Sequence, residues 1–279
     1  MLIEENVDLS LYTTFRMGGV ARRLIIPQTD NELLDVIQNT KLPRYIIGGG
    51  SNLLINNQRE FEEVISLREF NKNIISVGDG KFFVGAAVRL QKLIQTVNED
   101  GYGGIEYLYS VPGLVGGAVV MNAGRGNSKD EIGKYVVSVR AIKDGEIVEF
   151  DKEDCQFRKR GSIFKNSDII ILGALFQFIP GKPEDFKKLR EERIEYVKKV
   201  QDTSKPNFGT VFFKADSYIM GFVQKCSKSG SGVYFSPKTR NWMLNNGGTF
   251  EQAMVEINRV KKIHKFFHRP CEIEVIVWE

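Results

Sequence analysis

Three consecutive glycines follow a predicted strand near residue 48, and they restrict the possible fold more than any other feature of the sequence. The stretch GGGSNLLI, residues 48–55, comes directly after the apolar run 45–47. Glycine lets the backbone approach another group closely, and successive N–H groups in such a turn can surround phosphate oxygens. The spacing differs from the G-x-G-x-x-G fingerprint and from the P-loop. Taken alone, the stretch favours a tight turn.

A second glycine-rich stretch changes that interpretation. SVPGLVGGAVVMNAG, residues 110–124, places four glycines among apolar residues, and TTFRMGG, residues 13–19, adds two more beside a threonine and an arginine. These stretches are too apolar for ordinary surface loops. Two phosphate-sized cradles indicate a diphosphate, and we expect a large cofactor.

The order of predicted elements divides the chain into regions 1–67, 68–182 and 183–268, with a final strand at 269–279 that is a candidate to return to the second region. The first region alternates strands with a helix at 31–40, which favours parallel pairing. The second is rich in strands and contains a hairpin turn, KDGE. The third begins with a charged amphipathic helix. The fold class is therefore α+β.

Composition restricts the function classes. The hydrophobic fraction of 42% and charged fraction of 27% are those of a globular protein, and the net charge of +4 is mild. We expect no nucleic-acid partner, because there is no basic run with interleaved aromatics. We expect no membrane partner and a cytoplasmic location, because no apolar span or signal peptide is found. We expect no metal, with His264 and His268 on an exposed helix face.

Six stretches resemble a known family in their order and spacing over nearly the whole chain. They are TTFRMGG, YIIGGGSNLLI, GIEYLYSVPGLVGGAVVMNAG, FRKRGSIF, GTVFFK and EIEV. They are similar to the UDP-N-acetylenolpyruvoylglucosamine reductase (MurB) family of peptidoglycan precursor synthesis, in its shorter branch. The resemblance implies a two-subdomain FAD-binding module of the PCMH or vanillyl-alcohol-oxidase type, followed by an α+β substrate-binding domain.

The resemblance implies the cofactors FAD and NADPH. It implies FAD binding, with the diphosphate at the glycines, by Thr14, Arg16, Gly48, Gly49, Gly50, Ser51, Asn52, Leu53, Pro112, Gly113, Gly116, Gly117, Ala118, Asn122 and Gly124.

The resemblance also implies three catalytic residues for hydride transfer to an enolpyruvyl ether carried on a UDP-sugar. Arg160 matches the family arginine that polarises the substrate carboxylate, a task that suits a permanently charged planar fork. Glu274 matches an assisting carboxyl group, which would need to be protonated. Thr210 stands where the family's proton donor is typically serine; it keeps the hydroxyl and adds a methyl group. We expect catalysis to survive at a reduced rate.

Three more residues, Lys214, Ser236 and Asn241, are expected to contact the substrate, a UDP-linked amino sugar; each has an alternative as a surface residue or a cap. Lys159 and Thr239 depart from the family's usual tyrosine and histidine. Two other functions stay open. One is a flavin oxidoreductase of the same fold with another substrate, and the other is a non-catalytic FAD-binding relative. We expect a monomer.

Overall fold

The computed structural model of the protein describes residues 1–39, 45–126, 130–227 and 230–279, which form two compact units. Unit 1 comprises residues 1–4, 24–49 and 63–197, and unit 2 comprises residues 5–23, 50–62 and 198–279. The borders predicted at 67/68 and 182/183 both lie inside unit 1. The helix that opens the predicted third region belongs mostly to unit 1, because its arginines bond to that unit: Arg193 Nε donates to Ser110 Oγ (2.8 Å), and Arg190 bonds to Asn98.

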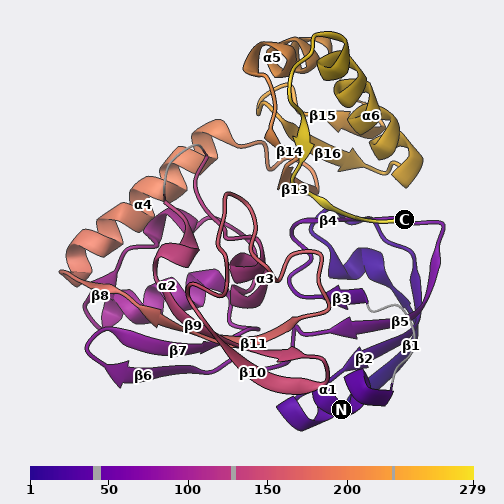
Figure 1. Cartoon of the computed structure of the whole chain (residues 1–279). Helices are drawn as coiled ribbons and strands as arrows, with labels where there is room; N and C mark the ends of the chain where they lie inside the picture. Colours follow the sequence, from indigo (N-terminus) through magenta and orange to yellow (C-terminus); the bar gives the residue numbers. More distant parts are fainter. Residues whose placement is uncertain (40–44, 127–129, 228–229) are drawn as a thin grey trace. The chain divides into compact units, whose positions relative to one another are not determined.

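A five-stranded antiparallel sheet forms the centre of unit 1, in the order β10-β9-β11-β7-β6 (Figure 1). Its strands are β6 (Ile74–Gly78), β7 (Lys81–Gly85), β9 (Val136–Lys143), β10 (Glu146–Asp151) and β11 (Ile170–Gln177). The predicted KDGE hairpin is confirmed. Asp144 and Gly145 have φ of 52° and 80°, the backbone sign that suits the twist of the two strands.

Helices α2 (Leu90–Glu99) and α3 (Val115–Val120) share a hydrophobic core with this sheet (Figure 1). Leu93, Ile94 and Val97 give α2 the three-to-four residue spacing that one buried face requires. Short elements connect the layers: η2 (Glu106–Leu108), η3 (Ile132–Lys134), and the pair β8 (Tyr102–Gly103) and β12 (Ile179–Pro180). The charged helix α4 (Pro183–Val200) closes the unit in sequence.

The strands and the helix predicted near the N-terminus are confirmed, but the helix does not join the parallel pair as expected. β3 (Tyr45–Ile47) pairs in parallel with β5 (Glu60–Ser66), and α1 (Asp30–Asn39) lies before it in sequence. With β1 (Leu2–Asp8) and β2 (Val20–Ile26) they belong to a sheet of order β1-β2-β5-β3. The division between the units falls within β1, β2 and β5, and η1 (Leu9–Tyr12) lies in unit 2.

Unit 2 contains a three-stranded antiparallel sheet with two helices (Figure 1). Its elements are β13 (Asn207–Thr210), β15 (Gly232–Phe235), β16 (Trp242–Asn246), α5 (Ser217–Cys226) and α6 (Phe250–Phe266). A capping box of Thr249 and Gln252 starts α6. The expectation of an exposed His264 is wrong: its side chain is fully buried, and its Nε2 accepts a hydrogen bond from the Asp216 N–H (2.9 Å).

The last strands close unit 2 by pairing with distant segments. β17 (Glu272–Ile273) pairs with β14 (Phe212–Lys214), and β18 (Ile276–Trp278) pairs in parallel with β4 (Leu53–Ile55). This corrects the expectation that the final strand returns to region 68–182, since the apolar alternation of a strand does not identify its partner. No helix of the described residues is long and apolar enough to cross a membrane.

Candidate functional site

Two of the predicted glycine stretches meet in unit 1. A Cβ atom at Gly49 would lie 3.2 Å from the Gly113 Cα and 3.5 Å from the Leu114 nitrogen, so the two backbones touch. Gly48 follows β3, and its carbonyl accepts a hydrogen bond from Arg68 Nε (3.2 Å). The glycines therefore do join two segments that lie about 60 positions apart in the sequence.

The glycines of α3 have two different environments. Gly116 is buried, its N–H donates to the Ala86 carbonyl (2.9 Å), and a Cβ there would lie 3.0 Å from the Ala86 Cβ. Gly117 is exposed, and no described atom lies within 4 Å of the position its Cβ would take. Gly116 thus serves close packing, whereas Gly117 leaves open space for a ligand. Pro112 is exposed like Gly117, while Ala118 is buried.

Asn122 is buried and holds a turn rather than offering its amide to solvent. It has a φ of 42°, and its Nδ2 donates to Glu131 Oε2 (2.8 Å) and to the Arg158 carbonyl (3.1 Å). Its Oδ1 accepts from the Gly133 N–H (2.9 Å). The segment 110–124 therefore supports the stretch that carries Arg160. Gly124 is half-buried and forms an antiparallel bridge with Glu131, and a Cβ there would lie 2.6 Å from the Asp130 carbonyl oxygen.

Arg160 lies in a two-residue hairpin turn. Arg158 and Gly161 exchange backbone hydrogen bonds of 2.9 and 3.0 Å, and Arg160 takes a φ of 58° between them. Arg158 and Lys159 are exposed, whereas Arg160 is half-buried. A left-handed backbone at a residue that is not glycine, asparagine or aspartate costs energy, and such residues cluster at active sites and ligand clamps. This geometry favours Arg160 over Arg158 as the functional arginine.

Unit 2 brings the N-terminal stretch against the end of the first glycine run. The Thr14 N–H donates to the Gly50 carbonyl (3.0 Å), and its hydroxyl donates to the Asn207 carbonyl in β13 (2.7 Å). Arg16 is exposed with a φ of 54°, and Ser51 is half-buried. Thr14 thus joins Gly50 to the strand that ends at Thr210.

Gly50 is confined by a close backbone approach, which gives a testable expectation. It has a φ of 62°, and a Cβ there would collide with the Tyr12 carbonyl oxygen. We expect Gly50→Ala to lower the free energy of unfolding by about 3 kcal/mol or more, because left-handed strain and a backbone clash add together. Urea denaturation with and without FAD measures this loss.

Gly247→Ala is the matched control for that variant. Gly247 also has a left-handed φ, 77°, but no described atom lies within 4 Å of its Cβ position. We expect a cost of only about 1 kcal/mol there. Equal losses in the two variants would show that the contact with Tyr12 is unimportant.

Glu274 is connected to both the glycine loop and Thr210. Asn52 Nδ2 donates to the Glu274 carbonyl (3.2 Å), and the Glu274 N–H donates to the Val211 carbonyl (2.8 Å), next to Thr210. Leu53, in β4, is buried and pairs with Ile276. Glu272 is exposed and forms an ion pair with Lys214 (2.9 Å). Unit 2 therefore places Glu274, and not Glu272, beside the predicted proton donor.

The predicted substrate contacts Lys214, Ser236 and Asn241 each have protein partners. Lys214 bonds to Glu272, and Asn241 bonds to Phe212. Ser236 is fully buried; its hydroxyl donates to Asp202 Oδ2 (2.6 Å) and accepts from the N–H groups of Lys238 and Thr239. The structure gives Ser236 a position-holding task.

Ser236→Ala should reduce stability in a pH-dependent way. Burial raises the pKa of Asp202, but hydrogen bonds from Ser204 and Ser236 outweigh burial and hold this pKa below its ordinary value. Such a carboxylate stabilises the folded state fully at pH values above its pKa in the unfolded chain, near 3.8. That stabilisation is lost as the pH falls through the lower pKa that the carboxylate has in the folded state. We expect urea denaturation to show a loss of about 2 kcal/mol at pH 7. The loss should shrink below pH 4; a loss independent of pH would contradict this account.

One residue that the sequence analysis missed supports the N-terminal stretch in unit 2. Asn245 is buried, and its Nδ2 donates to the carbonyls of Phe15 (2.8 Å) and Arg16 (3.3 Å). Its Oδ1 accepts from the Gly248 N–H (2.9 Å). The signal was the stretch NNGG at a strand end, which is typical of a turn-holding asparagine.

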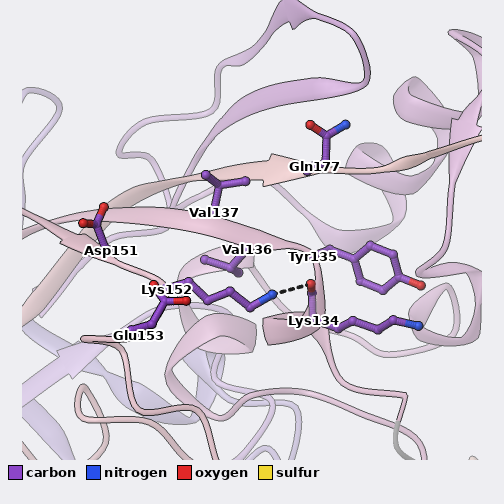
Figure 2. Close-up of a pocket in the computed structure, with 8 residues that line it drawn as sticks. All are labelled: Lys134, Tyr135, Val136, Val137, Asp151, Lys152, Glu153 and Gln177. Carbon is purple, nitrogen blue, oxygen red and sulfur yellow. Dashed lines mark hydrogen bonds between the residues drawn. The ribbon is translucent and has the colours of Figure 1, made fainter.

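A surface pocket of about 490 Å³ lies elsewhere in unit 1 (Figure 2). It is lined by Lys134, Tyr135, Val136, Val137, Asp151, Lys152, Glu153 and Gln177. The Lys152 ammonium donates to the Lys134 carbonyl (2.8 Å), as the dashed line in Figure 2 shows. None of the predicted site residues lines it. Among the described residues, no cluster of three or more His, Cys, Asp or Glu side chains could hold a metal ion.

The glycine geometry and the fold together define the class of protein. A family profile described as "FAD binding domain" matches residues 21–151. A variant of Phl p 4, described as a glucose oxidase, has a similar fold, with a TM-score of 0.51 and 13% identity over 65% of this chain and 42% of that one. The chain is an FAD-dependent oxidoreductase with a PCMH-type FAD-binding module and a further α+β part.

Relatives of known name identify the family. The chain is 31% identical to a UDP-N-acetylenolpyruvoylglucosamine reductase of Thermotoga sp. (strain RQ2), over 97% of this chain and 91% of the relative. It is 32% identical to the enzyme of that name from Carboxydothermus hydrogenoformans, over 93% of this chain and 88% of the relative. The crystal structure of that reductase (MurB) from Thermus caldophilus matches with a TM-score of 0.83 and 25% identity over 100% of both chains. The chain belongs to the UDP-N-acetylenolpyruvoylglucosamine reductase family.

Proposed function

We propose that this protein reduces the enolpyruvyl group of UDP-N-acetylenolpyruvoylglucosamine to give UDP-N-acetylmuramate for peptidoglycan precursor synthesis, with NADPH as the reductant. The observation that carries the proposal is the 2.8 Å hydrogen bond from the Glu274 N–H to the Val211 carbonyl, directly after Thr210. It brings a carboxyl-bearing and a hydroxyl-bearing residue into adjacent backbone positions. A flavin fold alone does not require this pair.

The residues present fit FAD. Gly49 and Gly113 bring the two glycine-rich segments into backbone contact, and no described atom lies within 4 Å of the position a Cβ would take at Gly117, which leaves room for a diphosphate there. Under the proposal these glycines, with Ser51 and the main chain of Asn52, hold the diphosphate. When bound, FAD supplies the hydride that it has received from NADPH.

The chain's own residues then stabilise the negative charge that develops on the substrate and supply the proton. Hydride addition to the terminal vinyl carbon moves an electron pair toward the adjacent carbon and its carboxylate. Arg160 holds and polarises that carboxylate through its guanidinium. Glu274, protonated, donates a hydrogen bond that stabilises the enol form. Thr210 Oγ1 delivers its proton to the adjacent carbon, which completes the addition of one hydride and one proton across the double bond.

Anaerobic stopped-flow spectroscopy tests the proposal. The purified protein is reduced with NADPH and mixed with the UDP-linked enolpyruvyl sugar, while the visible absorbance of the flavin is followed. Rapid reoxidation is expected. A flavin that NADPH reduces but the sugar does not reoxidise would favour the same fold acting on another substrate, and bound FAD that NADPH cannot reduce would favour a non-catalytic relative.

The proposal also includes the cellular setting and the partners expected from the sequence. The enzyme would act in the cytoplasm as a monomer, with its UDP-sugar as partner and no nucleic acid or membrane. Size-exclusion chromatography with light scattering tests the monomer, for which a mass near 31.7 kDa is expected. A larger mass at working concentration would overturn that part alone.

A further inference from the structure

Asn241 makes three hydrogen bonds to the two residues that follow Thr210. Its backbone carbonyl accepts from the Val211 N–H (3.1 Å), and its Oδ1 accepts from the Phe212 N–H (3.1 Å). Its Nδ2 donates to the Phe212 carbonyl (2.7 Å). Both polar atoms of the amide are thus directed at the protein backbone instead of a ligand.

The chain that carries Glu274 lies on the other side of the same segment. The Glu274 N–H donates to the Val211 carbonyl (2.8 Å), and Phe212 is opposite Ile273 in the β14–β17 pair. Val211 and Phe212 are buried, and all four of their backbone polar groups have partners in these contacts. The segment is therefore held between Asn241 and Glu274.

The local backbone explains why an asparagine occupies this position. The pairing of β13 with β16 shifts register between Asn207 and Thr210, and that of β14 with β17 shifts again after Phe212. An amide group offers a donor and an acceptor side by side, as the backbone of a neighbouring strand does. Asn241 also adopts a φ of 60°, which asparagine tolerates better than most residues. Its side chain therefore replaces a strand neighbour where the regular ladder is interrupted.

We propose that Asn241 is a positioning residue that fixes Thr210 and Glu274 relative to each other. For its catalytic consequence the inference rests on the function proposed above. A displaced hydroxyl would deliver its proton more slowly, because misplacement by about 1 Å can cost about 10²-fold in rate. Flavin reduction by NADPH does not use that proton and should be unaffected.

Hydrogen exchange of the backbone tests the positioning without any reference to activity. In Asn241→Ala, the amides of Phe212 and Glu274 should exchange at least tenfold faster than in the unaltered protein. Asn246→Ala is the matched control: Asn246 ends β16, the strand that begins directly after Asn241, and its Nδ2 donates to the Gly230 carbonyl (2.7 Å). Unchanged exchange at both amides in Asn241→Ala would overturn the inference.

A second variant keeps the test decisive if Asn241→Ala does not fold. Asn241→Asp retains the size of the side chain and an acceptor for the Phe212 N–H, but it loses the donor to the Phe212 carbonyl. We expect faster exchange at Glu274 in this variant as well. Rescue of normal exchange by aspartate would show that the Nδ2 contact is unnecessary and would overturn the inference.

Single-turnover kinetics test the consequence for catalysis. In Asn241→Ala we expect NADPH to reduce the flavin at the normal rate, while reoxidation by the UDP-linked enolpyruvyl sugar slows about 10- to 100-fold. The solvent deuterium isotope effect on reoxidation should rise, since proton delivery becomes limiting. Normal reoxidation in the variant would overturn the inference. If the unaltered protein is not reoxidised by the sugar, the proposed function fails, and the exchange measurements still decide the positioning.

Discussion

Replacing Thr210 by valine is expected to slow reoxidation of the reduced protein by the enolpyruvyl sugar by about 10²- to 10⁴-fold, the usual contribution of a general acid. Valine keeps the β-branched shape of threonine and removes only the hydroxyl. Thr210 is half-buried and pairs with Trp242 between β13 and β16, so the strand should remain in place. The rate is measured by stopped-flow absorbance at saturating sugar.

Thr210→Ser is the matched control for the hydroxyl. Serine carries the donor that relatives of this family typically use, and it removes the methyl group that restricts the side-chain torsion. We expect the serine variant to react as fast as the unaltered protein or faster. A valine variant that reacts at the normal rate would exclude Thr210 as the proton donor.

Replacing Arg160 by glutamine is expected to lower the same reoxidation rate by about 10²- to 10³-fold, the usual cost of losing one group that stabilises developing charge. Glutamine retains part of the side-chain length and polarity but has neither the charge nor the planar fork. The hairpin bonds between Arg158 and Gly161 involve backbone atoms, so they do not depend on the substituted side chain. Single-turnover reoxidation again gives the rate.

Arg158→Gln is the control for the loss of positive charge in this turn. Arg158 lies two residues earlier and is exposed, whereas Arg160 is half-buried. The control should therefore lose less than about threefold, the effect of a screened surface charge. Equal losses in the two variants would indicate that the turn contributes a general positive potential and that Arg160 has no specific task.

The glycine stretches were predictable from the sequence because their chemistry is local. Where the backbone has a positive φ or makes a close contact, the sequence usually has glycine, and Gly50 and Gly113 follow that rule. The KDGE hairpin and the existence of strands at β3 and β5 were predictable for a similar reason, since turn residues and short apolar runs indicate the adjacent structure directly.

The side-chain partners of three polar residues were not predictable in this way. Asn122, Ser236 and Asn241 look like ligand contacts in the sequence, yet their side chains bond to Arg158, Asp202 and Phe212. A polar side chain in a loop can bind a ligand or hold the backbone, and the sequence alone does not identify its tertiary partners. His264 follows the same logic: its spacing fits an exposed helix face, but it is buried against the start of α5.

The parallel pair of β4 and β18 has a consequence for how the protein is made. Leu53, Leu54 and Ile55 are buried in the folded protein, but their strand partner, Ile276–Trp278, is synthesised much later. At about 5–20 residues per second, the roughly 220 intervening residues take about 10–45 s to synthesise. During that interval an apolar strand lacks its native neighbour, and Glu274 reaches Val211 only after the segment that carries it has been synthesised. Synthesis of residues 274–278 is therefore a condition for assembling this part of unit 2.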